Sequence, residues 1–148
     1  MKRVLCLVLT AVLLLSTGVY AYADSPEPVS REVEYLPNGY YIVTELYTVQ
    51  TRAQQLVSGT KVQTLYAEAG NVVLTFEVNG TFKYNGTTCI ATLASYDYDI
   101  VVSGWYLVSG NAYCEDNSAV AKGNFKHPLF GTIDTTITLY CSPTGVLS

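Results

Sequence analysis

The sequence predicts an all-β protein, an antiparallel β-sandwich of about eight short strands. β-branched and aromatic residues, which favour strands, dominate from Tyr40 onward, and no long stretch has the 3.6-residue apolar spacing of a helix. Turn-forming pairs recur about every dozen residues, which is typical of a sandwich. These pairs are Ser58-Gly59, Gly70-Asn71, Asn85-Gly86, Gly110-Asn111 and Gly123-Asn124.

The N-terminus, residues 1–23, has the pattern of a signal peptide. Lys2 and Arg3 precede an apolar run, and Ala21-Tyr22-Ala23 has the small-x-small pattern of a cleavage site. We expect cleavage before Asp24 and release of a secreted, extracellular protein with no membrane association. An uncleaved anchor is the alternative, because the apolar stretch is just long enough to cross a bilayer.

Residues 24–36 contain two prolines and four acidic side chains without periodicity, so we expect a flexible lead-in before a β-sandwich domain over residues 37–148. Without the signal peptide the chain has six basic and twelve acidic side chains, a net charge of −6. Binding to nucleic acid or to anionic lipid needs clustered Lys and Arg. The composition therefore argues against nucleic-acid and membrane-surface functions.

Alternating side chains predict two strands most clearly. From Leu74 to Tyr84 the apolar residues share one parity, and a strand that continues through Asn79-Gly80 keeps this alternation. A three-residue loop with a glycine bulge is the alternative. The segment from Ile133 to Cys141 alternates equally well. Weaker candidate strands are 40–49, 60–67, 88–94, 96–102, 105–113 and 119–126. Residues 51–57 are weak strand formers, so we expect a loop or short helix there.

Three cysteines remain after signal cleavage, and an oxidising exterior makes one disulfide plausible. Cys89 shares strand parity with Leu93, and Cys141 shares it with Leu139, so both thiols are expected to face the core. Cys114 instead adjoins a polar turn. We predict a Cys89–Cys141 disulfide, with Cys114 either free or linked to a second chain.

Parts of the second half resemble a family of short exported proteins from Gram-positive, clostridial-type bacteria that is classed as a domain of unknown function. The resembling stretches are Thr81 to Thr87 with Cys89, Thr136 to Cys141, and Gly145 to Ser148. The likeness spans the chain from Tyr66 onward. It implies an exported β-sandwich and supports the predicted disulfide, while Cys114 lies outside its pattern. It implies no activity.

No residue pattern predicts catalysis, a metal site or a cofactor. His127 is the single histidine, lies in an expected loop and lacks a nucleophile motif to serve, so we interpret it as a bystander. Asp97 and Asp99 alternate on one strand face, and Glu115-Asp116 form a second acidic pair. Neither has the glycine-punctuated spacing of a calcium loop. We therefore expect a protein that is not an enzyme, with no catalytic, metal or cofactor-binding residue.

Tyrosine is in excess, with eleven remaining after signal cleavage beside Trp105. Most are expected to pack as good strand formers. Tyr140 is the best candidate for an outer binding surface by parity, whereas Tyr41, Tyr47 and Tyr106 are ambiguous. Because a small sandwich fills its interior with side chains, we expect binding on an outer sheet face and no cavity of several hundred Å³.

The sequence thus indicates a non-catalytic extracellular binding or interaction module whose partner is an unknown extracellular protein or glycan. A secreted, bacteriocin-like antagonist or inhibitor is the alternative.

Overall fold

The computed structural model describes residues 27–51 and 55–148, which form eight β-strands and no helix. The strands are β1 Ser30–Tyr35, β2 Tyr41–Thr51, β3 Leu56–Tyr66, β4 Val72–Tyr84, β5 Cys89–Ile100, β6 Tyr106–Glu115, β7 Ser118–His127 and β8 Gly131–Tyr140. Within these residues, no helix has the length and apolar character needed to cross a membrane. The expected signal peptide, residues 1–23, lies outside the described part of the chain.

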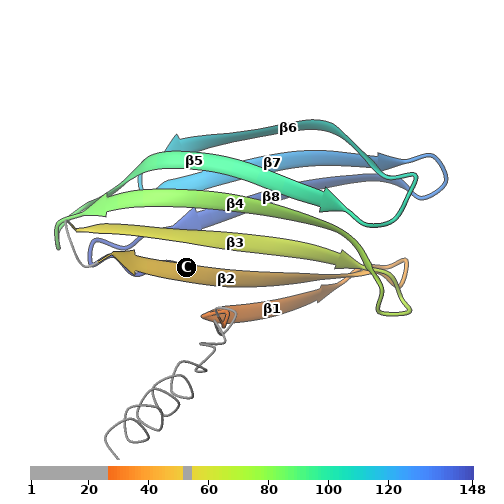
Figure 1. Ribbon diagram of the computed structural model, residues 1–148, viewed down its shortest axis with the longest axis horizontal. Helices are drawn as coiled ribbons and strands as arrows, with labels where there is room; N and C mark the ends of the chain where they lie inside the picture. The colour runs from red at the N-terminus through yellow and green to blue at the C-terminus, as the bar shows by residue number, and fades with distance from the viewer. Residues whose placement is uncertain (1–26, 52–54) are drawn as a thin grey trace, which may run out of the picture.

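The eight strands form two antiparallel sheets that pack against each other (Figure 1). The larger sheet has the order β1-β2-β3-β4-β5 and the smaller one the order β6-β7-β8. Each strand therefore pairs only with its neighbours in sequence. The chain crosses from one sheet to the other through residues 101–105, and β5 and β6 lie in contact on that side. The predicted all-β class and two-sheet sandwich are confirmed.

Side-chain alternation in β4 builds the centre of the core. The buried residues of this strand include Leu74, Phe76, Val78, Gly80 and Phe82. The strand continues through Gly80 as predicted, and Gly80 pairs with Gly59 of β3 and Ala94 of β5. Glycine is needed at this position because a Cβ would come within 2.9 Å of Ala119 in β7. The ring of Phe76 meets Phe125 of β7 edge-on, with 5.6 Å between ring centroids, and this contact joins the two sheets.

A disulfide bond joins Cys89, at the start of β5, to Cys141, directly after β8, with 6.2 Å between their Cα atoms. Both cysteines are buried, whereas Cys114 is exposed and free, so the predicted pairing is confirmed. The expectation that Leu93 faces the core with Cys89 is wrong. Leu93 is exposed, because a β-bulge beside Phe82 shifts the register between β4 and β5.

The strands differ from the sequence prediction most clearly in three places. Ser30–Tyr35, expected within a flexible lead-in, form the edge strand β1, whose side chains are all exposed and give no burial pattern. The two strands expected at 88–94 and 96–102 are the single strand β5. Residues 56–57, expected in a loop or short helix, begin β3, and residues 52–54 and 24–26 lie outside the described residues.

Three of the five predicted turn pairs lie inside strands instead, namely Ser58-Gly59 in β3, Gly110-Asn111 in β6 and Gly123-Asn124 in β7. The glycines at these places give space to large neighbours. A Cβ at Gly110 would approach the Tyr96 ring within 2.8 Å, and one at Gly123 would approach the Phe125 ring within 3.0 Å. Glycine therefore marks close packing here rather than a turn.

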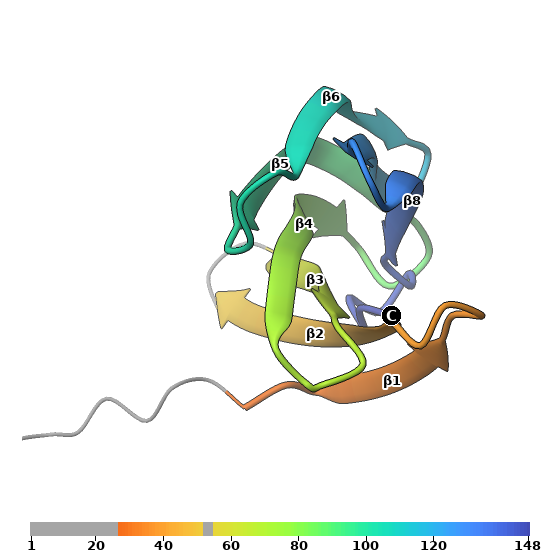
Figure 2. The same cartoon turned by 90° about the vertical axis from the view of Figure 1, so that its right-hand side faces the viewer.

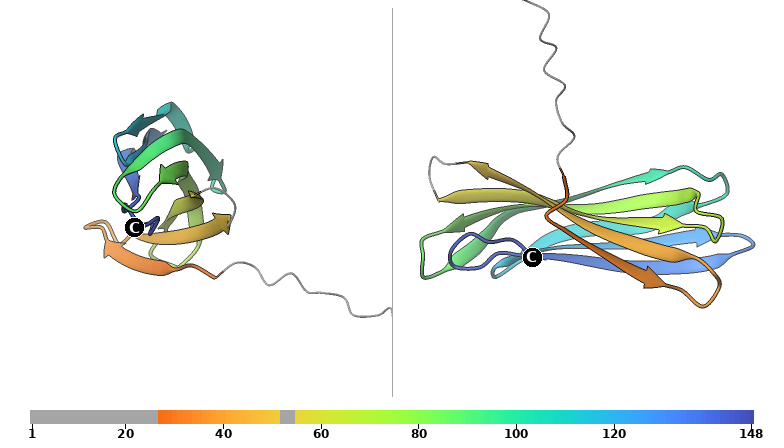
Figure 3. Two further views of the ribbon diagram at one scale, coloured as in Figure 1. Left: turned by 90° about the vertical axis from the view of Figure 1, so that its left-hand side faces the viewer. Right: turned by 90° about the horizontal axis from the view of Figure 1, so that it is seen from below.

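The smaller sheet covers only part of the larger one. β7 packs on β4 and β5, and β8 packs on β3 and β4. β1 and β2 extend beyond β8, as the end-on views show (Figures 2 and 3). The C-terminus also lies on this side, between β8 and the larger sheet (Figure 2). The offset leaves one side of the sandwich open, opposite the side where β5 leads into β6.

Candidate functional site

A groove of about 620 Å³ occupies the open side of the sandwich, between the edge strand β8 and the overhanging strands β1 and β2. Its lining residues are Glu34, Leu36, Pro37, Asn38, Tyr40, Ile42, Gln63, Trp105, Phe130 and residues 132–136. The expectation that this small sandwich has no cavity of several hundred Å³ is therefore wrong. The side chains fill the space between overlapping strands, but they leave it open where the sheets do not overlap.

The floor of the groove is the inner surface of the larger sheet. Glu34 and Ile42 are register partners in β1 and β2, and Ile42 is in turn opposite Leu65 of β3. Gln63, on the same face of β3, reaches across the floor and accepts a hydrogen bond from the Thr135 hydroxyl of β8. The wall is the edge of β8, so the groove has a polar side and a partly apolar base.

Aromatic rings close one end of the groove. The Tyr40 and Phe130 rings lie 6.2 Å apart, and Phe130 is 57% exposed. Behind Phe130, the His127 ring lies 4.6 Å from it and 5.4 Å from the ring of Trp105. Exposed rings offer a ligand large contact areas at low cost in conformational entropy. This end of the groove is therefore suited to an apolar group.

His127 supports this aromatic end as a structural residue. It ends β7 and is buried, and its Nδ1 accepts hydrogen bonds from the backbone N–H groups of Leu129 (3.1 Å) and Phe130 (3.3 Å). The neutral ring therefore carries its proton on Nε2. These two hydrogen bonds stabilise the turn after β7, which positions the Phe130 ring at the groove. The expectation that His127 lies in a loop is wrong, because the strand pairing of β7 with β8 extends to His127 and Gly131.

The groove has an acidic border along β1. Glu34 projects towards the groove from β1. Asp134 borders the groove through its backbone in β8, while its side chain shares the outward parity of Tyr140 and accepts a hydrogen bond from the Asn124 side chain on the outer surface. Glu32 shares the face of Glu34, two positions earlier on β1, and is exposed. Among the described residues, no lysine or arginine lines the groove. Its potential therefore favours neutral or positively charged ligands.

Tyr140 lies on the outer surface of the smaller sheet and is 50% exposed, as its parity predicts. No other aromatic ring among the described residues contacts it. It is the last residue of β8, whereas the groove is lined by the first half of that strand. The structure thus separates Tyr140 from the aromatic end of the groove.

A row of tyrosines crosses the outer surface of the larger sheet. The rings of Tyr41 and Tyr66 stack almost parallel at 4.8 Å, and Tyr35 tilts against Tyr41 at 5.7 Å. These are cross-strand neighbours in β1, β2 and β3. Such pairs stabilise a sheet by direct side-chain contact. Packing therefore accounts for Tyr41, which parity had left ambiguous, while Tyr35 stays 79% exposed at the sheet edge.

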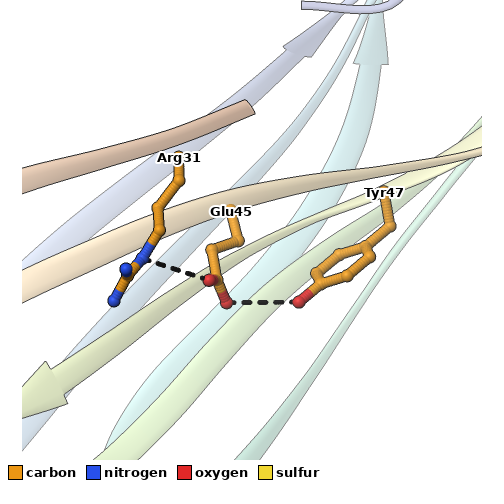
Figure 4. Close-up of polar contacts among 3 residues, drawn as sticks. All are labelled: Arg31, Glu45 and Tyr47. Carbon is orange, nitrogen blue, oxygen red and sulfur yellow. Dashed lines mark hydrogen bonds and ion pairs between the residues drawn. The ribbon is translucent and has the colours of Figure 1, made fainter. Parts of the chain in front are cut away.

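Three polar side chains interact on the same outer surface (Figure 4). Glu45 pairs with Arg31 at 3.3 Å and accepts a hydrogen bond from the Tyr47 hydroxyl at 3.2 Å. Burial raises the pKa of the Tyr47 hydroxyl above its usual value, and the negative charge of Glu45 raises the pKa further. These contacts join β1 to β2 and give Tyr47, the second ambiguous tyrosine, a structural role.

The acidic pairs considered from the sequence form no metal site. Asp97 and Asp99 project from β5 beside Glu77 and are exposed. Glu115 ends β6, and Asp116 lies in the tight turn between β6 and β7. Among the residues that the structure describes, no group of three or more His, Cys, Asp or Glu side chains is arranged to hold a metal ion.

Comparison with protein-family models, with curated proteins and with solved structures found no match for this chain. The candidate site therefore rests on the geometry of the groove alone. Sequence reasoning missed the groove, although one signal was present. Lys61 and Gln63 are polar residues on the inward parity of β3, where a fully covered strand would carry apolar side chains.

Proposed function

We propose that this protein is exported and acts outside the cell as a non-catalytic binding module, with its ligand in the groove beside β8. The N-terminal signal pattern and the disulfide support the extracellular location. The groove is the observation that carries the binding function, because it is concave and combines aromatic rings with a few polar groups.

The chemistry of the groove favours binding over catalysis. Neither histidine nor cysteine lines it, and the nearby His127 uses Nδ1 for backbone hydrogen bonds. Acyl or phosphoryl transfer by a side-chain nucleophile needs a general base, such as histidine, next to a hydroxyl or thiol. The groove hydroxyls of Thr132, Thr135 and Thr136 have no such partner among the described residues. The described lining of the groove therefore offers no base for this kind of transfer, which supports binding as its role.

Two adjacent apolar residues offer a matched test. Phe130 lines the groove, whereas Leu129 is 85% exposed and does not. We expect Phe130→Ser to weaken binding about tenfold or more, because it removes an aromatic ring that contacts the ligand, and Leu129→Ser to have little effect. The probes are a cell-wall glycan preparation, mucin and a displayed library of random short peptides.

A third variant separates the groove from the outer surface. If Tyr140→Ala abolishes binding while Phe130→Ser does not, the ligand lies on the outer surface of the smaller sheet and the groove is not the site. If none of the three probes binds, the binding function itself is refuted. Thermal unfolding of each variant distinguishes lost contacts from lost folding.

A further inference from the structure

We infer that the ligand of the groove is an extended, positively charged polypeptide segment that pairs with β8 as an additional strand of the smaller sheet. This inference rests on the proposed function and specifies the class of partner. It follows from three properties of the groove: an unpaired strand edge, space for one more strand, and acidic side chains.

Hydrogen bonds at the C-terminal end of β8 show in which direction the backbone groups of each residue point. The N–H of Tyr140 donates to the carbonyl of Ser148 at 2.9 Å, and the N–H of Ser148 donates back at 3.0 Å. The next residue, Cys141, directs its N–H the other way, to Asn117 on the side of β7. Because successive residues of a strand alternate in this direction, the even-numbered residues of β8 direct both backbone groups away from β7.

Three of these outward-facing residues, Thr132, Asp134 and Thr136, lie in the groove. Each offers one N–H donor and one carbonyl acceptor, and none of these groups has a partner among the described residues. The next one, Thr138, already accepts a hydrogen bond from Lys61. The open edge is therefore bounded, with Lys61 at one end and the turn at Phe130 at the other.

The space beside this edge has the dimensions of a strand. Five residues of β8 line the groove, which corresponds to about 16 Å of strand at roughly 3.3 Å per residue. A segment paired there would lie over β2 and β1, which the smaller sheet leaves uncovered (Figure 2). Alternate side chains of that segment would point to the floor at Ile42 and to solvent. Strand addition of this kind is a common way of recognising peptides.

The negative charges at the groove favour a peptide segment with basic side chains. Glu34 faces the groove from β1, and Glu32 extends this acidic border along the same strand, whereas the Asp134 side chain lies on the outer surface of the smaller sheet. A lysine or arginine in the segment would meet the carboxylates along β1, and an apolar side chain would meet the rings of Tyr40 and Phe130. The partner is thus expected to alternate basic and apolar residues.

Hydrogen exchange of individual amides tests the pairing directly. In the free protein, the N–H groups of Thr132, Asp134 and Thr136 should exchange fast, while those of Ile133 and Thr135, bonded to β7, exchange slowly. Peptides selected from a displayed random library should then slow the first set by about tenfold or more. Selected peptides that bind without protecting these three amides overturn strand addition.

A pair of variants isolates the backbone donor. Thr136→Pro removes the N–H that faces the groove and leaves the hydrogen bonds to β7 in place, because proline is tolerated at a strand edge. Thr136→Val keeps the N–H and removes only the hydroxyl. Strand addition predicts about a tenfold or greater loss of peptide binding for proline and near-native binding for valine. Equal effects of both variants contradict it.

The outcomes also separate the alternatives. If cell-wall glycan binds the groove with Phe130-dependent affinity and without protecting the three amides, the proposed function stands and the polypeptide partner is wrong. If the amides become protected with rising protein concentration and without peptide, the occupant is a second copy of this chain, and the inference is again wrong. Selected peptides without basic residues would contradict the charge argument.

Discussion

The Nζ of Lys61 in β3 donates a hydrogen bond to the backbone carbonyl of Thr138 in β8 at 3.3 Å. This contact connects the inner surface of the larger sheet to the free edge of the smaller one. It lies at one end of the groove, which extends from here towards the start of β8 at residues 132–136. A charged group directed at a strand edge also limits the pairing of that edge with other strands.

Replacement of Lys61 tests this connection. We expect Lys61→Ala to lower the free energy of unfolding by about 1–3 kcal/mol, since it removes both a charge-assisted hydrogen bond and the packing of the aliphatic stem. Lys61→Met keeps the stem and should recover part of this loss. Chemical denaturation of the three proteins measures both effects. Equal stabilities of the alanine and methionine variants would assign the whole loss to the hydrogen bond.

Removal of the disulfide should destabilise the protein far more than removal of the free thiol. We expect Cys89→Ser to cost about 2–5 kcal/mol, because the bridge constrains the unfolded chain between β5 and the end of β8. Cys114→Ser should have almost no effect, since the thiol is exposed and free. A tryptic map of the oxidised protein that links Cys114 to another cysteine would refute this assignment.

The backbone turn at Phe130 should depend on the His127 acceptor. His127→Phe keeps an aromatic ring against Trp105 but leaves the N–H groups of Leu129 and Phe130 without their partner. We expect a loss of about 1–3 kcal/mol in stability and faster exchange of those two amides. His127→Asn, with a side-chain oxygen that can accept, is the control. Unchanged exchange in the phenylalanine variant would show that the turn forms without the imidazole.

Tyr47 predicts a change of stability at alkaline pH. Its pKa is raised above the usual value of 10.0 in the folded protein, first by burial and then by Glu45. The folded state therefore binds more protons than the unfolded chain in this range. The contribution of Tyr47 to the free energy of unfolding is therefore fully present below the pKa that its hydroxyl has in the unfolded chain. It is lost as the pH rises through the pKa in the folded protein. Tyr47→Phe should flatten this alkaline decline in a series of unfolding curves; an identical decline in both proteins would assign it to other groups.

Export predicts the N-terminus of the mature protein. The signal pattern ends at Ala23, so secreted material should begin at Asp24. Intact-mass measurement and N-terminal sequencing of protein from a culture supernatant check this directly. Retention of residues 1–23 on the secreted chain would contradict cleavage, and retention with membrane association would favour the uncleaved anchor.

The strands of the core could be predicted from the sequence because burial alternates along them. β4 and β8 carry apolar residues at every second position, and the parity of Cys141 with Leu139 places it correctly in the core. β1 could not be found in this way. An edge strand exposed on both faces has no alternating burial, and its register is visible only through its partner β2.

The groove could not be predicted from alternation either, because it depends on which strands of one sheet lie over which strands of the other. Periodicity assigns a side chain to a face but does not say whether that face is covered. Gln63 illustrates the difference, since it has the parity of the buried Leu65 yet lines the groove. Tyr140 was placed correctly on an outer surface, and its role in binding stays a prediction.

The order of the strands has a consequence for how the chain folds. Because every strand pairs only with its neighbours in sequence, both sheets can grow by successive hairpins without waiting for distant segments to meet. Closure of the sandwich is the step that must bring β3 to β8 and Cys89 to Cys141. Oxidation should therefore follow hairpin formation, and the reduced chain should reach native-like strand content before the sheets dock.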